Sequence, residues 1–274
     1  MTPLRQEMIS SMRLRNYSPK TIKQYTLCVS QFARHFDRCP STIGPKEVTQ
    51  YLLYLIDEKK CSWSHYRQAL CGLRYLYTKV LGHEWMAEHL PFPRRERSLP
   101  QFLTPDEMKL VLESVEHPKH RMMLEVIYAT GVRCGELVRL RVEDIDSKRD
   151  VIIVRDGKGH KERLTLLGEN LLLKLRKYYR QYRPKEWLFE GRDGHAKESV
   201  PQKACNRAEE ASGIGKRVTP HSIRHSFATA LLEQNVDLIT IGNLLGHARI
   251  KTTELYAHVT LKKIQQTPKP LDTL

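Results

Sequence analysis

Apolar side chains recur at helical spacing through most of the first ninety residues. A Ser-Pro pair at 18–19 is a helix start signal, and the stretch "TIKQYTLCVSQFARHF" at 21–36 then repeats apolar residues every three or four positions. A Gly-Pro pair at 44–45 opens a second such stretch, and "SWSHYRQALCGLRYLYTKVL" at 62–81 is a third. The pattern predicts a helical N-terminal domain over residues 1–90.

The composition changes after this helical region. The stretch "LPFPRRERSLPQ" sets three prolines around three arginines, a composition typical of a linker, which we place at residues 91–102. The sequence Thr-Pro-Asp-Glu at 104–107 has the pattern of a capping box and begins a new helix. We therefore expect a second domain over residues 103–274.

The hydrophobic period changes inside this second domain. It starts at helical spacing in "HRMMLEVIYATGVRCGELVRL", but "DVIIVRD" and "ERLTLL" are β-like runs joined by the hairpin signal "GKGHK". Helical spacing resumes at about residue 169. The predicted fold is therefore mainly α-helical with a small β-sheet.

The charge of the chain points to a polyanionic partner. It carries 46 Lys and Arg against 31 Asp and Glu, a net charge of +15, which favours nucleic acid before a membrane surface. Residues 1–100 hold 16 basic and 8 acidic residues, about half of the excess. Both domains are thus expected to face the polyanion, as the two jaws of a clamp would, although general solubility is the simpler explanation of such a charge.

Cysteine usage and hydropathy suggest the compartment. Six cysteines show no C-x-x-C pair and no regular spacing, so a disulfide framework or zinc ribbon is not expected. The chain opens with no signal-peptide pattern and has no run of about 18 apolar residues. We expect a cytoplasmic protein with no membrane partner.

Four short clusters contain residues that could carry chemistry. Arg133 follows a helix-breaking glycine, and Lys158 lies at the glycine-flanked tip of the hairpin. His221 and Arg224 lie in the first turn of a helix begun by Thr219-Pro220. The fourth cluster follows a helix-ending glycine and contains His247 and Tyr256.

Each residue alone has a structural explanation: an ion pair for Arg133, a turn lysine for Lys158, a core position for Tyr256. His221 and His225 have the spacing of helical zinc ligands, but Ser222 stands where H-E-x-x-H has its glutamate.

Together these residues supply the parts for phosphodiester transfer without a metal or another cofactor. Arginine forks neutralise non-bridging oxygens, and the helix start with His221 and Arg224 suits a phosphate. A lysine or histidine can protonate the leaving oxygen. A tyrosine can be a nucleophile whose phosphodiester keeps the energy of the broken bond, so that rejoining needs no ATP.

The motifs "ATGVRCGELVRLRVEDID", "GKGHKERL", "HSIRHSFAT", "LLGHA" and "TTELYAHV" resemble, in this order, those of the tyrosine recombinase (phage integrase) family. The resemblance covers residues 103 to about 260, and "NYSPKTIKQY" is similar to the family's helical core-binding domain. It implies a C-shaped clamp of two domains around double-stranded DNA. It also implies a homotetramer on paired recombination sites, in which the C-terminal tail contacts a neighbouring subunit.

The resemblance assigns a role to each candidate. It implies that Tyr256 attacks the scissile phosphate to form a 3′-phosphotyrosyl link and that Arg133 and Arg224 hold the non-bridging oxygens. In the same way Lys158 protonates the 5′-oxygen, His221 assists proton transfer and His247 hydrogen-bonds the phosphate.

Several alternatives stay open at the level of sequence. Within the family, a mobile-element recombinase is preferred over Xer-type dimer resolution. Lys158 and His221 are only 63 positions apart, which leaves little room for an integron-type insertion. Outside it, the rivals are a type IB topoisomerase, a DNA-binding regulator without catalysis and a metal-dependent nuclease.

Overall fold

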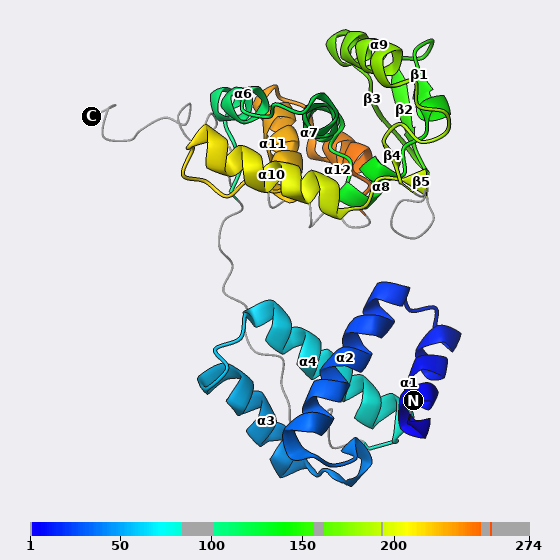
Figure 1. The fold of residues 1–274 in the computed structure, drawn as a ribbon, viewed down its shortest axis with the longest axis vertical. Coiled ribbons are helices and arrows are strands. Elements are labelled where there is room, and N and C mark those ends of the chain that lie inside the picture. Colours follow the sequence, from blue (N-terminus) through cyan, green and yellow to red (C-terminus); the bar gives the residue numbers. More distant parts are fainter. Residues whose placement is uncertain (1, 84–100, 156–161, 193, 248–252, 254–274) are drawn as a thin grey trace, which may run out of the picture. The chain divides into compact units, whose positions relative to one another are not determined.

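The fold was taken from a computed structural model, which describes residues 2–83, 101–155, 162–192, 194–247 and 253 (Figure 1). The chain divides into two compact units, Met1–Glu96 and Arg97–Leu274. Most of the predicted linker at 91–102 lies outside the described residues.

The N-terminal unit is built from helices whose starts follow proline or serine signals. Its helices are α1 (Pro3–Leu14), α2 (Pro19–Phe36), α3 (Pro45–Asp57) and α4 (Trp63–Tyr75), with a 3-10 turn at Pro40–Thr42 and a π-helical turn η2 at Leu76–Val80 after α4. The Ser18 and Ser62 side chains accept backbone N–H groups at the starts of α2 and α4. The helix starts predicted at 18–19 and 44–45 are confirmed.

The core of this unit is rich in aromatic rings. Phe32 of α2 is fully buried and meets Tyr51 of α3 edge to face, with ring centroids 5.0 Å apart. Tyr77, in the π-helical turn, is buried among the same helices and donates its hydroxyl to the carbonyl of Pro40 at 2.8 Å. Burial of these rings fixes the four helices of the unit around one core.

The C-terminal unit is organised around α7 (Pro118–Thr130), which lies between other helices in Figure 1. Every residue of α7 from Met122 to Ile127 is buried, so this helix is covered on all sides through its middle. The surrounding helices are α6 (Pro105–Glu113), α8 (Cys134–Val138), α9 (Glu169–Tyr182), α10 (Ser199–Ser212), α11 (Pro220–Glu233) and α12 (Leu238–Leu245). The capping box predicted at 104–107 is present at the start of α6.

The small sheet of this unit is antiparallel. It has the order β1 (Ile145–Asp146), β2 (Val151–Val154) and β3 (Arg163–Leu166), and a second pair is formed by β4 (Glu190–Gly191) and β5 (Gly194–His195). Val154 pairs with Arg163, so β2 and β3 form the predicted hairpin. The prediction of a mainly α-helical fold with a small β-sheet is confirmed. No helix among the described residues meets the length and apolarity needed to cross a bilayer.

Gly131 lets three helices approach one another. It ends α7 in the left-handed conformation with φ of +64°, as the sequence predicted for a helix-breaking glycine. A Cβ at this position would lie 2.4 Å from a ring carbon of Phe227 on α11 and 2.8 Å from a methyl of Leu245 on α12. No other residue fits there, and the end of α7 is therefore held against α11 and α12.

Candidate active site

At the start of α8, a glutamate and an arginine are hydrogen-bonded to each other. Arg133 is the residue before α8, and its backbone N–H and its Nη1 both donate to Glu136, each at 2.8 Å. Glu136 retains 4% of its side-chain surface, whereas Arg133 keeps 31%. Glu136 and Arg133 thus form an ion pair in which the glutamate is buried and the arginine stays accessible from solvent.

A second arginine reaches the same glutamate from β3. Arg163 donates Nη1 and Nη2 to the two oxygens of Glu136 at 3.0 and 2.6 Å. This is a bidentate pair, the strongest geometry that an arginine and a carboxylate form. Arg163 was not among the residues predicted from the sequence. Its position directly after the hairpin signal, at the start of a strand facing helices, is the only local sign of its role.

Arg224 of α11 is turned into the interior rather than out from the first turn of its helix. Only 2% of its surface is exposed, and its Nη1 donates to the carbonyl of Gly131. Its Nη1 also lies 4.0 Å from an oxygen of Glu136. The sequence predicted an anion site at this helix start from His221 and Arg224. In the structure the guanidinium of Arg224 lies in the interior, beside the carbonyl of Gly131 and the carboxylate of Glu136.

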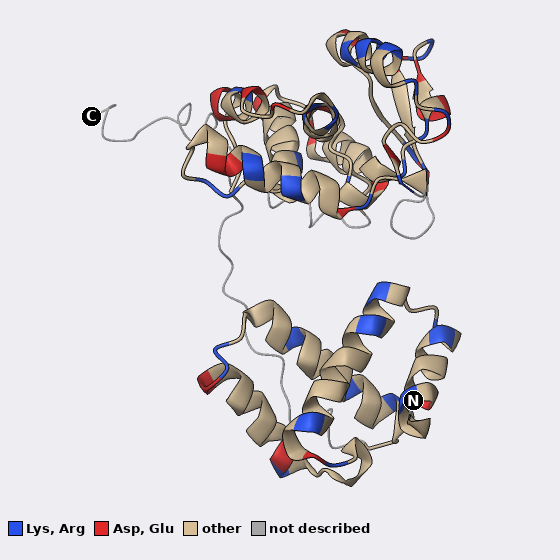
Figure 2. Ribbon diagram, viewed as in Figure 1, with Lys and Arg blue, Asp and Glu red and all other residues tan. Residues whose placement is uncertain are grey.

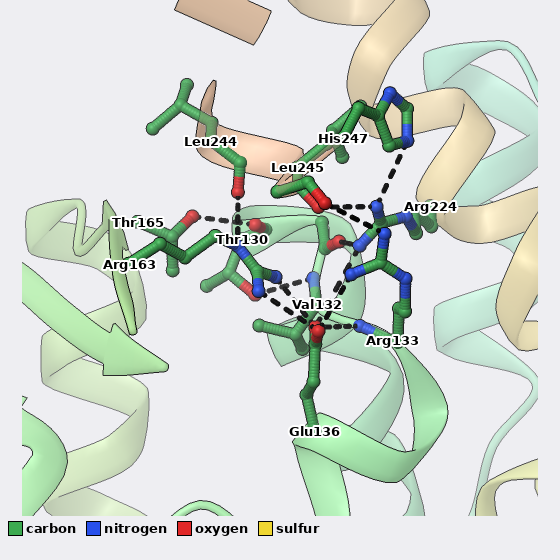
Figure 3. Close-up of polar contacts among 12 residues, drawn as sticks. Thr130, Val132, Arg133, Glu136, Arg163, Thr165, Arg224, Leu244, Leu245 and His247 are labelled. Atoms are coloured by element: carbon green, nitrogen blue, oxygen red, sulfur yellow. Dashed lines mark hydrogen bonds and ion pairs between the residues drawn. The ribbon is translucent and has the colours of Figure 1, made fainter. Parts of the chain in front are cut away.

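The three arginines converge on the end of α12 (Figure 3). Arg163 Nε donates to Leu244 O at 2.8 Å, and Arg224 Nη2 donates to Leu245 O at 2.7 Å. Arg133 Nη2 donates to Gly246 O at 3.1 Å. Three consecutive carbonyls at the negative end of a helix are thus each bound by an arginine from a different element.

Gly246 makes this convergence possible. It ends α12 with φ of +63°, which confirms the predicted helix-ending glycine. A Cβ here would lie 2.9 Å from Cδ of Arg163 and 3.1 Å from its Nε. A side chain at this position would push the guanidinium of Arg163 away from the helix end.

His247 follows Gly246 and borders the arginines. Its Nε2 lies 3.3 Å from Arg224 Nη2, and its Nδ1 lies 3.0 Å from the hydroxyl oxygen of Thr253. Burial, then the charges of Arg224 and Arg133, lower the pKa of His247 to about 4. The imidazole is therefore neutral at pH 7, so one ring nitrogen can accept a hydrogen bond while the other donates.

His221 lies on the exposed side of α11, and its ring centroid is 4.5 Å from that of His225. Desolvation lowers the pKa of His221 below its usual value, with a further contribution from Arg224 and Arg133. Desolvation, followed by the charges of His221 and Arg224, lowers the pKa of His225 to about 4. No group of three His, Cys, Asp or Glu side chains suited to a metal occurs among the described residues.

The electrostatics of the cluster favour a bound anion. Burial raises the pKa of Glu136, but hydrogen bonds and charge from Arg163 and Arg133 outweigh it and bring the pKa to about 2. One permanent negative charge is therefore enclosed by three permanent positive charges. The surplus of two positive charges, with neutral histidines at the rim, is suited to a phosphodiester and to the charge that grows on it during transfer.

The structure brings four of the six predicted residues into one region: Arg133, Arg224 and His247 are joined through hydrogen bonds, and the pKa of His221 is lowered by the charges of both arginines. Lys158 and Tyr256 lie outside the described residues, although the two strands of the hairpin that carries Lys158 are described.

Comparison with known proteins identifies the family. The chain matches the model "Phage integrase family" over residues 101–263 and the model "Phage integrase, N-terminal SAM-like domain" over residues 4–87. A Sinorhizobium fredii protein named "Putative integrase/recombinase y4qK" is 43% identical over all of this chain and 90% of its own length. Tyrosine recombinase XerA of Pyrococcus horikoshii is 30% identical over 95% of this chain and 90% of its own.

A solved structure gives the same fold at lower identity. A lambda integrase dimer bound to a COC′ core site matches with a TM-score of 0.75 and 20% identity, covering 95% of each chain. The arginine-rich site thus lies in a known architecture, and the family model spans more than half of the sequence. The chain belongs to the phage integrase family and is a tyrosine recombinase.

Proposed function

We propose that this recombinase cuts and rejoins DNA at specific sites through a 3′-phosphotyrosyl intermediate on Tyr256, with no metal and no ATP. The observation that carries the proposal is the cluster of Arg133, Arg163 and Arg224 around the single carboxylate of Glu136. The cluster binds the end of α12 at Leu245, eleven positions before Tyr256 in the chain. Because Tyr256 follows this segment closely in the sequence, we infer that the cluster holds the phosphate that Tyr256 attacks.

The roles of the remaining groups follow from their charge states. Arg133, which keeps solvent access, and Arg224, whose edge borders His247, hold the non-bridging oxygens. His221 is neutral at pH 7 and can accept the proton that the Tyr256 hydroxyl loses. His247 donates a hydrogen bond to the phosphate, and Lys158 protonates the 5′-oxygen as it leaves.

Double-stranded DNA is the partner we propose, and the charge of the N-terminal unit supports it. Helices α2 and α4 contain Lys and Arg but no Asp or Glu, whereas the acidic residues of the described part of this unit lie on α1, on α3 and at the residues directly after α2 and α3 (Figure 2). Helices whose Lys and Arg are not offset by Asp or Glu can neutralise backbone phosphates. We assign residues 1–90 to core-site binding, 91–102 to a linker and 103–274 to catalysis.

The proposal also covers the oligomeric state on DNA and the biological role. A homotetramer on two sites, joined through the C-terminal tails, exchanges strands in pairs, and the element served is a mobile one. The 43% identical relative is named an integrase/recombinase, which supports this role. Inverted repeats around a short spacer beside the gene would support it further, whereas a lone chromosomal resolution site would indicate dimer resolution.

Covalent capture tests the reaction and finds the DNA site in the same experiment. The protein is mixed with duplexes that carry a randomised core and nicks at varied positions, so that the cut fragment diffuses away and the adduct cannot rejoin. Adducts that survive denaturation are sequenced, which yields both the site and the scissile position. The wild-type chain should form them in EDTA, and Tyr256→Phe should bind DNA without forming any. Adducts at normal yield with Phe at 256 would show that the nucleophile is another residue.

A 5′-bridging phosphorothiolate separates the two candidate proton donors. Sulfur leaves with little protonation, so Lys158→Ala should be slow on ordinary DNA and close to wild type on the sulfur substrate. Arg133→Ala should be slow on both, because the non-bridging oxygens still require positive charge. Rescue of His221→Ala instead of Lys158→Ala would assign the acid to His221.

A further inference from the structure

We propose that Arg163 is a positioning residue for the transfer reaction: it fixes Glu136 and the end of α12 and so sets the places of the two arginines that bind the phosphate. This inference rests on the proposed function. It concerns a residue that touches no reacting group and acts through the protein atoms around it.

The contacts of Arg163 are all made to the protein. Each of its three nitrogen atoms donates to a protein oxygen: Nε to the carbonyl of Leu244, and Nη1 and Nη2 to the carboxylate of Glu136. Its side chain is 9% exposed. Arg133 differs, because it shares the same carboxylate but keeps 31% of its side chain exposed. The guanidinium of Arg163 is thus held inside the protein, whereas that of Arg133 remains accessible to a phosphate.

The charge of Glu136 explains why the inner arginine matters. With Arg163 in place, the carboxylate is bound on both oxygens, and Arg133 contributes one further donor to Oε1 at 2.8 Å. Without Arg163, a buried carboxylate that is 4% exposed would have Arg133 as its nearest charged partner. Glu136 would then compete with the phosphate for Arg133, and the surplus positive charge of the cluster would fall from two to one.

The end of α12 provides the second link. Leu244, Leu245 and Gly246 present successive carbonyls, and the arginine on the first is Arg163. The other two carbonyls are bound by Arg224 and Arg133. Because the carbonyls belong to one rigid helix end, displacement of the first displaces the positions at which the phosphate-binding arginines are held.

The test uses the full-length protein and the DNA site obtained by covalent capture. Arg163→Gln removes the charge, and Arg163→Lys keeps a charge that cannot span both carboxylate oxygens and the carbonyl. The matched control is Lys174→Gln. Lys174 is ion-paired at 2.7 Å to Glu125, a carboxylate 8% exposed that keeps Arg121 at 3.5 Å as a second partner.

Single-turnover adduct formation separates binding from chemistry. At saturating DNA, Arg163→Gln should form adduct about 10²-fold more slowly than wild type, the size of effect expected when a reacting group is misplaced by about 1 Å. The DNA concentration for half-saturation should change by less than about 3-fold, because phosphate contacts elsewhere set affinity. The rate of adduct formation by Arg163→Lys should lie between those of wild type and Arg163→Gln, and the rate of Lys174→Gln should match wild type.

A methylphosphonate at the scissile position distinguishes positioning from a general loss of structure. Replacement of one non-bridging oxygen by methyl removes the negative charge, so neutralisation by Arg133 and Arg224 is no longer needed. The ratio of wild-type to Arg163→Gln rates should then shrink from about 10²-fold to within about 5-fold, since the missing electrostatic contribution applies to neither enzyme. Arg163→Lys should show the same recovery if the glutamine variant does not fold.

The outcomes separate the two proposals. An unchanged ratio on methylphosphonate, or adduct formation by Arg163→Gln at the wild-type rate, would overturn the role of Arg163 and leave the recombinase reaction intact. Absence of any adduct with the wild-type chain would overturn the proposed function, and the role of Arg163 with it.

Discussion

Helices α3 and α8, one in each unit, begin with the same local arrangement. In α3, Glu47 accepts the backbone N–H of Gly44 at 2.8 Å and Nη1 of Arg38 at 2.6 Å. In α8, Glu136 accepts the backbone N–H and Nη1 of Arg133. The two glutamates differ in burial, since 33% of one side chain and 4% of the other is exposed.

The difference shows what turns a helix cap into part of a functional site. Among the described residues, the N-terminal unit buries no charged side chain, whereas the C-terminal unit buries Glu125, Glu136, Asp144 and Arg224. Burial of charge is costly unless partners are supplied from other elements. The N-terminal unit therefore keeps its charges at the surface, where they can meet DNA, whereas the C-terminal unit buries charges that need partners from several elements.

Replacing Glu136 and Glu47 in turn by glutamine should give the largest difference in unfolding free energy between the two units. Glu136→Gln leaves Arg133, Arg163 and Arg224 without their shared carboxylate, and we expect a loss of about 3–5 kcal/mol in the unfolding free energy of the C-terminal unit. Glu47→Gln, at an exposed pair, should change little. Urea titrations followed by the amide NMR signals of each unit measure both. Equal losses would show that burial does not separate the two caps.

Removal of the buried arginine should affect chemistry more than binding. Arg224→Ala is expected to slow adduct formation about 10²-fold or more, because one donor to the developing charge is lost, while DNA affinity stays within a few-fold. Arg38→Ala, the corresponding surface arginine of the N-terminal unit, should leave the rate unchanged. Single-turnover cleavage at saturating DNA gives the comparison, and equal rates for both variants would contradict it.

Mild acid should weaken the two units unequally. Burial, followed by the charge of Arg224 for His247 and of His221 for His225, lowers the pKa of both histidines from 6.5 to about 4. The unfolded chain therefore binds more protons between pH 6.5 and 4, and the C-terminal unit should lose stability steadily as the pH falls through that window. Urea midpoints measured for each unit at pH 7 and pH 5 test this. An equal shift in the two units would refute it.

The smallest expected effects concern DNA affinity. Arg67→Gln and Lys79→Gln, at exposed positions on α4 and η2, should each lower the slope of log affinity against log salt by about 1. Adduct formation at saturating DNA should not change, because these side chains lie in the unit without the cluster. A normal salt slope with slow cleavage would reverse the division of roles between the units.

Local signals in the sequence predicted much of this architecture. Proline after a cap residue located the starts of α2, α3, α6 and α11, and glycines marked the ends of α7 and α12. The alternation of β-like residues around a glycine-rich turn located the β2–β3 hairpin. These features depend on residues within a few positions of one another.

The remainder depends on contacts between distant residues. Arg163 and Glu136 are 27 positions apart, and Arg224 meets a carbonyl 93 positions away. No local pattern encodes which guanidinium is buried, so Arg163 was missed and the burial of Arg224 against Glu136 was not predicted. The π-helical turn at Leu76–Val80 and the two-residue strands were missed as well, since packing rather than propensity sets them.

The bound end of α12 constrains how this chain can vary in length. Three consecutive carbonyls are matched to three arginines, so substitution of the Leu244 or Leu245 side chain alters packing, but deletion of one residue shifts every acceptor by one. We therefore expect that inserting or deleting a single residue anywhere between Ile241 and His247 abolishes recombination. The same changes should be tolerated near Gly213, where a glycine faces open space. Evolution of this enzyme can change the identity of the residues at the end of α12 more readily than their number.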